Sequence, residues 1–287
     1  MDIAYQCAPD HPYVKSHPQW PALQQVYHTL NQNGYKAYLA GGCVRDALLG
    51  RVANDLDLAT DATPDTVESL FTKTVAVGKA FGVILVIVDG VSIEVATFRS
   101  DGMYADGRRP DKVVFTTPEQ DAQRRDFTVN ALFYDLHESR VLDFVGGVDD
   151  LQAQSLKAVG NPEARFREDH LRLLRAIRFS AQLGFELESE TLKATKDLAS
   201  LVKSVSSERI HDETLKLLKS RNAEKGLALM ASTGIGEVLF PNFSNVYQKH
   251  KKQFQQLLPT EQKDSDFVWA SFLAPWAIHK DVAWEWI

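Results

Sequence analysis

In the first half of the chain, apolar runs with the spacing of strands alternate with runs that have the spacing of helices. The strand-like runs lie at residues 37–40, 55–59, 83–88, 92–98 and 141–144. The helix-like runs lie at residues 23–30, at 42–49 after a Gly-Gly turn, and at 64–71. Asp89-Gly90, between two of the strands, is a strong hairpin signal. These residues therefore predict a mixed α/β domain.

After Gly160 the apolar spacing is helical nearly to the end of the chain. Helices are predicted at 168–183, 190–202, 207–218 and 223–232. The predicted fold class is α+β, with a mixed sheet and its helices followed by an all-helical region. Four large apolar side chains that need burial come last: Trp269, Trp276, Trp284 and Trp286. They either pack back on the helices or mark the start of a further domain.

Composition and charge narrow the class of protein. The 287 residues are 44% hydrophobic and 24% charged, as in globular proteins, and no apolar run approaches the roughly 18 residues of a membrane helix. The net charge of −6 argues against a general polyanion binder, but residues 216–252 hold seven basic and two acidic residues and could form a local basic face. No signal peptide is visible, and Cys7 and Cys43 form no CxxC pair, so we expect a reducing, cytoplasmic location.

A Gly-Gly turn is the first candidate for binding chemistry. Gly41-Gly42 follows a predicted strand and opens a predicted helix, where backbone N–H groups can approach a phosphate. Arg45, one turn into the helix, could add a cation. A tight turn without a ligand is the alternative. The sequence contains neither the GxxxxGK[ST] nor the GxGxxG pattern, which disfavours those nucleotide-binding designs.

Three carboxylates are predicted to converge beside this turn. Asp55 and Asp57 alternate with Leu56 and Leu58, so on a strand both acids point to one face, roughly 7 Å apart. Two such charges are tolerated best when cations sit between them, and oxygen ligands suit magnesium. A hairpin could place Glu94 beside the pair. Three carboxylates next to a phosphate-binding turn suit two-metal phosphoryl transfer, whereas solvated surface acids are the alternative.

A polar cluster lies in RRDFTVNAL, residues 124–132. Arg125, Asp126 and Asn130 supply a donor, an acceptor and an amide within a short stretch. Taken alone, the segment predicts a helix start with Asp126 or Thr128 as its cap.

A second polar cluster lies in REDHLRLLRAIRF, residues 167–179. On one helix, Asp169, Arg172 and Arg175 share a face, and Glu168 and Arg178 adjoin it. A surface helix held by ion pairs is the alternative to a binding site.

In this order, the segments resemble the tRNA nucleotidyltransferase and poly(A) polymerase family of the class II type. The resemblance runs from about Gly34 to Leu218. It rests on GGCVRDALLG with the DLD pair, IEVATFR, DGMYADGRRP, RRDFTVNAL, REDHLRLLRAIRF and SSERIHDE. It implies a nucleotidyltransferase head at 1–152, a helical neck with base recognition at 153–213 and an RNA-binding helical body at 214–287.

The resemblance also implies roles for individual residues. Asp55 and Asp57 would bind two magnesium ions (Mg2+), and Glu94 would lie near the attacking hydroxyl. The nucleotide-binding residues would be Gly42 and Arg45 for the triphosphate, Arg125, Asp126 and Asn130 for the ribose, Asp169 and Arg172 for the base, and Arg175 and Arg178 as support. Residues 99–110 match the flexible loop that helps the family switch from CTP to ATP.

The chemistry of base choice follows from the residue types of Asp169 and Arg172. A carboxylate accepts and a guanidinium donates, which matches the N6 donor and N1 acceptor of adenine and the N4 donor and N3 acceptor of cytosine. Guanine and uracil present the reversed pattern, and each buried mismatch costs roughly 1–3 kcal/mol. The pair can therefore select A and C without a nucleic-acid template.

The expected reaction is attack by the 3′-hydroxyl of a tRNA on the α-phosphate of CTP or ATP, with one magnesium activating the hydroxyl and the other stabilising pyrophosphate. CCA addition is favoured; A-addition alone and poly(A) synthesis are the alternatives.

The family usually has about four hundred residues and a C-terminal tail domain, so a fragment or a short variant is expected. From other classes, the alternatives are an inactive RNA-binding protein and a phosphohydrolase built on His211-Asp212.

Overall fold

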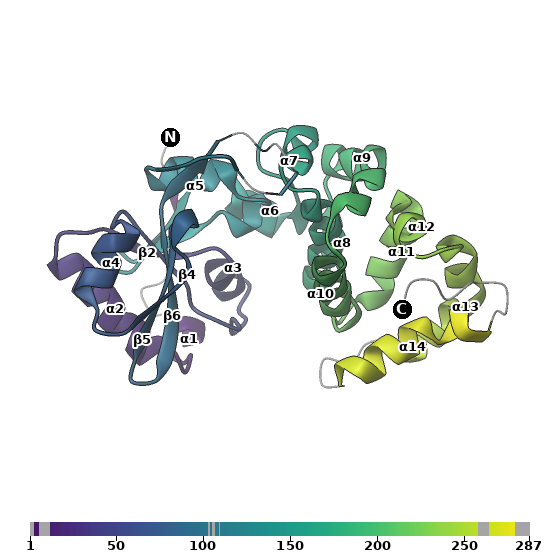
Figure 1. Ribbon diagram of the computed structural model, residues 1–287, viewed down its shortest axis with the longest axis horizontal. Helices are drawn as coiled ribbons and strands as arrows, with labels where there is room; N and C mark the ends of the chain where they lie inside the picture. The colour runs from purple at the N-terminus through teal and green to yellow at the C-terminus, as the bar shows by residue number, and fades with distance from the viewer. Residues whose placement is uncertain are drawn as a thin grey trace. The chain divides into compact units, whose positions relative to one another are not determined.

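The computed structural model of the chain describes residues 3–5, 12–102, 104, 107–108, 110–257 and 264–278. Its residue contacts divide the chain into two compact units (Figure 1). The first comprises Met1–Met103, Pro110–Ala153 and Lys157–Gly160, and the second comprises Tyr104–Arg109, Gln154–Leu156 and Asn161–Ile287.

A mixed sheet organises the first unit. Among the described residues it has eight strands, in the order β1-β10-β9-β2-β3-β6-β5-β4. They are β1 (Ile3–Tyr5), β2 (Ala37–Ala40), β3 (Leu58–Thr60), β4 (Thr74–Gly78), β5 (Val83–Val88), β6 (Val91–Thr97), β9 (Phe133–Asp135) and β10 (Arg140–Asp143). Strands β3 and β6 run parallel, and the other neighbours are antiparallel. A separate antiparallel pair is formed by β7 (Arg99–Asp101) and β8 (Val113–Phe115).

Helices cover the apolar face of this sheet. The helices of the first unit are α1 (Pro12–Lys15), α2 (Trp20–Gln32), α3 (Gly42–Leu48), α4 (Pro64–Leu70), α5 (Pro118–Arg124) and α6 (Gly147–Gln152), with 3-10 turns at Lys79–Phe81 and Thr128–Asn130. Helices α2 and α4 pack against β5 and β6 (Figure 1). Ile93 and Val95 are fully or almost fully buried, at 0% and 1% exposure. Because side chains alternate along a strand, Glu94 points to the opposite face of β6.

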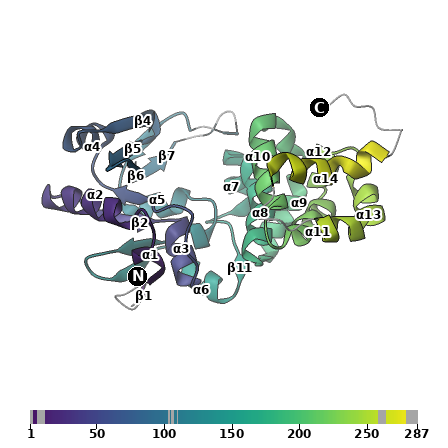
Figure 2. The same ribbon diagram turned by 90° about the horizontal axis from the view of Figure 1, so that it is seen from below.

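The second unit is helical apart from one short strand pair. That pair is β11 (Ser155–Leu156) with β12 (Glu186–Leu187), which run parallel. The helices are α7 (Pro162–Glu168), α8 (Leu171–Leu183), α9 (Ser189–Asp197), α10 (Ser207–Leu218), α11 (Ala223–Thr233), α12 (Ile235–Leu239), α13 (Phe243–Leu257) and α14 (Ser265–Ile278), with a 3-10 turn at Ala199–Ser204. Helix α8 packs against α10 and α11 (Figure 2). Within the described ranges, no helix combines the length and the apolar character that crossing a membrane requires.

The tryptophans of α14 pack back on the helical unit. The Trp276 side chain is buried, and its Nε1 donates to the Pro241 carbonyl oxygen at 2.8 Å. Trp269 stacks on His211 with ring centroids 4.9 Å apart. This confirms the first of the two expectations for these residues, while Trp284 and Trp286 lie outside the described residues.

The α+β prediction is confirmed, and several elements begin or end elsewhere than expected. The strand predicted at 55–59 begins at Leu58, so both aspartates precede it. The helix predicted at 168–183 is interrupted, because Asp169 has extended backbone angles and its Oδ1 accepts the Leu171 N–H at 3.1 Å. The helix predicted at 190–202 ends at Asp197 and continues as a 3-10 turn.

The predicted cap in RRDFTVNAL is also wrong. The segment forms a 3-10 turn, Thr128–Asn130, without a side-chain cap. Asp126 instead accepts from Phe127 N–H and from the Asn130 side chain, and the Thr128 hydroxyl donates to Asp150. The side chains of Asp126 and Thr128, which the local pattern assigns to a helix cap, are therefore engaged by other partners.

Candidate active site

The first unit brings three carboxylates close together. Asp55 and Asp57 lie just before β3, and Leu56 and Leu58 between and after them are buried at 1% and 0% exposure. The side chains of Asp55 and Asp57 therefore both point away from the core, on the side opposite to the two leucines, as the alternation predicts. Strand β6 lies parallel to β3 with Leu58 opposite Val95, which sets Glu94 beside Asp57.

The electrostatics of the group follow from this crowding. Burial, and then the negative charges of Asp55 and Glu94, raise the pKa of Asp57 to about 7, and Arg125 offsets part of this shift. Burial and the charge of Asp55 also raise the pKa of Glu94. The three groups repel one another, so the site stabilises a bound cation.

A divalent metal ion fits these residues when a substrate supplies further oxygens. In the part of the chain that the structure describes, no side-chain hydrogen bond or ion pair involves Asp55, Asp57 or Glu94. Nor, among those residues, does any group of three or more His, Cys, Asp or Glu side chains lie close enough to hold a metal ion alone. Magnesium is commonly bound by one or two carboxylates together with substrate phosphates and water. These carboxylates therefore suit magnesium when a bound triphosphate supplies the remaining oxygen ligands.

The raised pKa of Asp57 predicts how stability depends on pH. The unfolded aspartate has a pKa near 3.8, whereas the folded pKa is about 7, so the folded protein binds more protons between these values. Stability is therefore expected to fall as the pH rises through this range, and Asp57→Asn should remove this part of the dependence. Melting temperatures of metal-free protein at about pH 5.5 and about pH 8 measure the effect. An equal pH dependence in both proteins would contradict the assignment.

The Gly-Gly turn lies at the start of α3. Strand β2 ends at Ala40, and Gly41 has φ 74° and ψ −125°, a conformation open to glycine and strained for other residues. A Cβ at Gly41 would lie 2.8 Å from Arg125 Nη1. The turn is thus packed against the motif that contains Arg125, which sequence distance alone does not reveal.

The polar motif residues of the first unit form one network beneath this turn. The Arg45 side chain is buried, donating from Nη1 to Asn130 Oδ1 at 2.5 Å and pairing with Asp46 at 2.9 Å. The Asn130 amide in turn donates to Asp126 Oδ1 at 3.2 Å. Arg125 donates to the Asn130 carbonyl at 3.1 Å and lies over the Phe133 ring. The structure therefore brings together Gly42, Arg45, Arg125, Asp126 and Asn130, all singled out from the sequence.

Replacing Gly41 by alanine is expected to lower both stability and nucleotide affinity. The new methyl group must displace Arg125 and adopt a strained backbone, at a cost of about 1–3 kcal/mol. Gly34→Ala is the matched control, because Gly34 also has positive φ but open space around its Cβ position. Thermal melts and nucleotide titrations of both variants check this. Equal nucleotide affinities in the two variants would show that the contact with Arg125 is irrelevant to binding.

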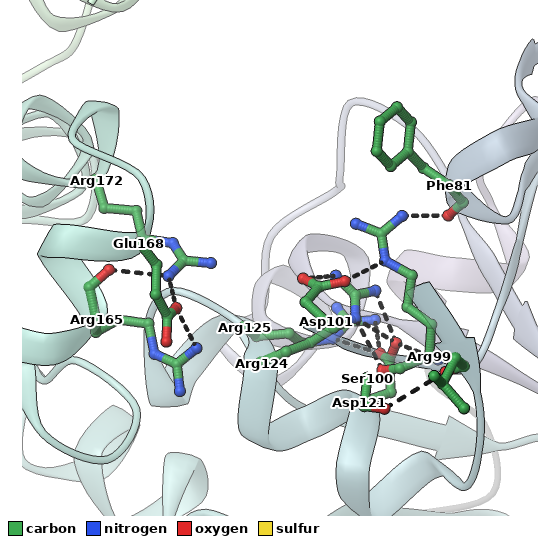
Figure 3. Close-up of polar contacts among 11 residues, drawn as sticks. Phe81, Arg99, Ser100, Asp101, Asp121, Arg124, Arg125, Arg165, Glu168 and Arg172 are labelled. Atoms are coloured by element: carbon green, nitrogen blue, oxygen red, sulfur yellow. Dashed lines mark hydrogen bonds and ion pairs between the residues drawn. The ribbon is translucent and has the colours of Figure 1, made fainter. Parts of the chain in front are cut away.

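The second unit contains the other predicted cluster, around the break between α7 and α8. Asp169 accepts two hydrogen bonds from Arg209 Nη2, at 3.2 and 2.9 Å. Arg172 is buried and donates from Nη1 to Glu168 at 2.5 Å and to the Arg165 carbonyl at 2.9 Å (Figure 3). Both side chains are thus held in place by neighbours, and Arg209, which lies in the SSERIHDE motif, is a partner that helical spacing does not predict.

Arg175 and Arg178 brace the helices of this unit. Arg178 Nε donates to Glu213 Oε2 at 2.5 Å, and Arg175 lies 3.8 Å from the same carboxylate. Both guanidinium groups lie over the Phe179 ring, at 3.7 Å for Arg178 and 5.1 Å for Arg175. These contacts join α8 to α10 and suit a supporting role.

His211 and Asp212 lie next to each other on α10, where His211 also stacks on Trp269. Their side chains are 3.3 Å apart, and His170 Nδ1 lies 2.5 Å from the Ser204 hydroxyl. Neither histidine belongs to a metal-binding group among the described residues. The structure therefore offers no support for the phosphohydrolase alternative.

The sequence matches two models of protein domains. Residues 37–157 match the poly(A) polymerase head domain, and residues 184–246 match a domain described as the probable RNA and SrmB-binding site of polymerase A. Together the two matches cover 184 of the 287 residues, and the head-domain match includes all three carboxylates.

Curated proteins and solved structures give the same picture. The chain is 49% identical over 215 residues to the CCA-adding enzyme of Bacillus pumilus (strain SAFR-032), which covers 75% of this chain and 54% of that one. It is 41% identical over 238 residues to the CCA-adding enzyme of Lactobacillus helveticus (strain DPC 4571), covering 83% and 58%. It thus spans about half the length of the curated relatives it matches.

Among solved structures, the fold is similar to that of the Bacillus stearothermophilus CCA-adding enzyme in complex with CTP. The TM-score is 0.79 at 34% identity, covering 92% of this chain and 64% of that one. The Thermotoga maritima CCA-adding enzyme complexed with tRNA shares the fold, with a TM-score of 0.73 at 22% identity over 97% of this chain and 69% of that one.

Proposed function

Because this chain belongs to the tRNA nucleotidyltransferase and poly(A) polymerase family, we propose that it adds C and A nucleotides, as CCA, to the 3′ end of tRNA without a template. CTP and ATP are the proposed substrates, and the cytoplasm is the proposed location. The observation that carries the proposal is the carboxylate group Asp55, Asp57 and Glu94 on a sheet whose neighbouring β2–α3 turn is Gly41-Gly42. The names of the matched relatives support the same choice.

The residues of the first unit would perform the transfer. The 3′-oxygen of the RNA attacks the α-phosphorus, the bond to the β-phosphate breaks, and pyrophosphate leaves. When bound at Asp55 and Asp57, two magnesium ions would favour ionisation of the 3′-hydroxyl and stabilise charge on the triphosphate. Glu94 is the proposed acceptor of the hydroxyl proton, since its raised pKa brings it closer to the range of an effective base.

The turn and its network would hold the rest of the nucleotide. Gly42 at the start of α3 offers its backbone to the triphosphate, and the buried Arg45 places a positive charge behind the turn. Arg125, Asp126 and Asn130 present polar groups from one network, which suits recognition of the ribose hydroxyls.

The residues of the second unit would choose the base. Arg209 and the Leu171 N–H fix the Asp169 carboxylate, and Glu168 fixes Arg172. An acceptor and a donor held in this way select adenine and cytosine over guanine and uracil by the complementarity of their hydrogen-bonding edges. Arg175 and Arg178 are proposed to support this cluster through Glu213.

The test is incorporation of labelled CTP and ATP, separately and together, into tRNA ending at the discriminator base, at C and at CC, with magnesium. CCA addition that then stops supports the proposal. A single A added to tRNA ending in CC alone indicates an A-adding enzyme, and long A tails indicate a poly(A) polymerase. Binding of RNA without release of pyrophosphate would indicate an inactive RNA-binding protein.

A further inference from the structure

Asp121 is a buried carboxylate in α5 that binds donors from two directions. Its side chain is 2% exposed. Oδ1 accepts the Arg99 backbone N–H at 3.1 Å and Arg124 Nε at 2.8 Å, while Oδ2 accepts Arg125 Nε at 3.1 Å (Figure 3). Each oxygen therefore serves a different part of the first unit.

The charge of Asp121 is retained in spite of its burial. Burial alone would raise the pKa of this carboxyl, but the guanidinium groups of Arg125 and Arg124 and the Arg99 N–H outweigh it, and the pKa lies below its ordinary value. Asp121 is thus ionised near neutral pH and acts as the counter-ion of both arginines.

On one side, the contacts of Asp121 and Arg124 lead to strand β7. Arg124 Nε also donates to the Arg99 carbonyl at 3.1 Å, and Arg124 Nη1 lies 3.9 Å from Asp101 Oδ2. Arg99 pairs with Asp101 at 3.1 Å. Helix α5 therefore holds both the backbone and the side chains of β7, the strand that enters the DGMYADGRRP segment.

On the other side, the contacts lead to Arg125 and the Gly-Gly turn. With Nε bound to Asp121, the Arg125 guanidinium reaches the Asn130 carbonyl and lies 4.7 Å from the Phe133 ring centroid. Its Nη1 is the atom nearest to the Cβ position of Gly41. Asp121 is the anionic partner that fixes this orientation.

We propose that Asp121 is a positioning residue that ties the ribose-facing Arg125 to strand β7. This inference rests on the proposed function, in that Arg125 is taken to face the ribose of the nucleotide. Asp121 contacts Arg125 and β7 rather than the nucleotide, so it acts through them. Removing the charge of Asp121 should therefore reduce the preference for ribose over deoxyribose. Removing the contacts between α5 and β7 should reduce the same preference through Asp121.

The test compares equilibrium binding of CTP and 2′-deoxy-CTP to the full chain and its Asp121→Asn variant. The preference for CTP is expected to fall about tenfold, the effect of one charge-assisted hydrogen bond. Loss of folded protein lowers the affinity for both nucleotides equally and leaves their ratio unchanged, so a merely structural role is distinguishable. Glu119→Gln, an exposed position on the same helix, is the control and should leave the ratio unchanged.

Two further variants complete the test. Asp121→Glu keeps the charge but shifts it by one methylene, so it should fold and still show a reduced ratio if the asparagine variant does not fold. Arg124→Gln keeps Arg125 intact while weakening the link to β7, and its ratio should fall by a smaller factor. Unchanged ratios in both Asp121 variants would overturn the role of Asp121, and an unchanged ratio in Arg124→Gln would overturn the link to β7. A wild-type chain that binds neither nucleotide would instead contradict the proposed function.

Discussion

Replacing Asp55 or Asp57 by asparagine is expected to reduce nucleotide transfer by about a thousandfold or more, which corresponds to about 4 kcal/mol of transition-state stabilisation. Each variant removes a negative charge from the group in which Asp55, Asp57 and Glu94 influence one another. The loss of charge weakens the binding of a divalent metal ion and of the triphosphate charge that the metal would neutralise. Initial rates of pyrophosphate release with saturating CTP and primer tRNA measure the effect.

The same substitutions should leave the fold intact, and they should stabilise it where repulsion is relieved. Asp57→Asn removes a half-buried charge whose pKa is raised by burial and by its neighbours, so its melting temperature in metal-free buffer should equal or exceed that of the wild type. Asp89→Asn, at the exposed tip of the β5–β6 hairpin, is the matched control and should transfer normally. Transfer within a few fold of the wild type in both Asp55 and Asp57 variants would remove these residues from catalysis.

The second large effect is expected from Asp169→Asn, which should lower the preference for C over U and for A over G by about 10–100-fold. A carboxylate can only accept hydrogen bonds, whereas an amide presents both an acceptor and a donor, so the reversed pattern of uracil or guanine is no longer excluded. The asparagine can still accept the Leu171 N–H, which preserves the local turn. Competition assays with all four nucleoside triphosphates measure the preference.

The control for base choice is Asp197→Asn, an exposed acid at the end of α9 in the same unit. It should leave the preference unchanged. The Asp169 variant should release pyrophosphate at a rate closer to that of the wild type than the Asp55 and Asp57 variants do, because its carboxylate is assigned to selection and not to the transfer itself. Unaltered preference in Asp169→Asn would contradict the assignment of base reading to this residue.

The parts of the fold that follow from local pattern could be predicted from the sequence. Strand β2 and helix α10 have the predicted bounds, since apolar spacing and the flanking Gly, Ser and Pro residues define them locally. The face of β6 that Glu94 occupies was also within reach, because side chains alternate along a strand. The parallel pairing of β3 with β6 was not, since it joins segments far apart in the sequence.

Long-range polar partners account for most of what the sequence could not predict. Asp169 pairs with Arg209, forty residues further along the chain. Its side chain also accepts the Leu171 N–H at the break between α7 and α8. Asp121 could have been found, because it lies three and four residues before Arg124 and Arg125, the spacing of ion pairs on a helix. Its contact with Arg99, however, depends on the β7–α5 packing, which local periodicity does not specify.

CCA addition by this chain is tested most directly by sequencing the 3′ end that it produces on tRNA truncated after the discriminator base, with magnesium and all four nucleoside triphosphates present. CCA with no further addition is expected, and no product is expected from a chain that lacks the Asp55 and Asp57 carboxylates. Extended homopolymer tails, or ends that contain G or U in proportion to their supply, would contradict it.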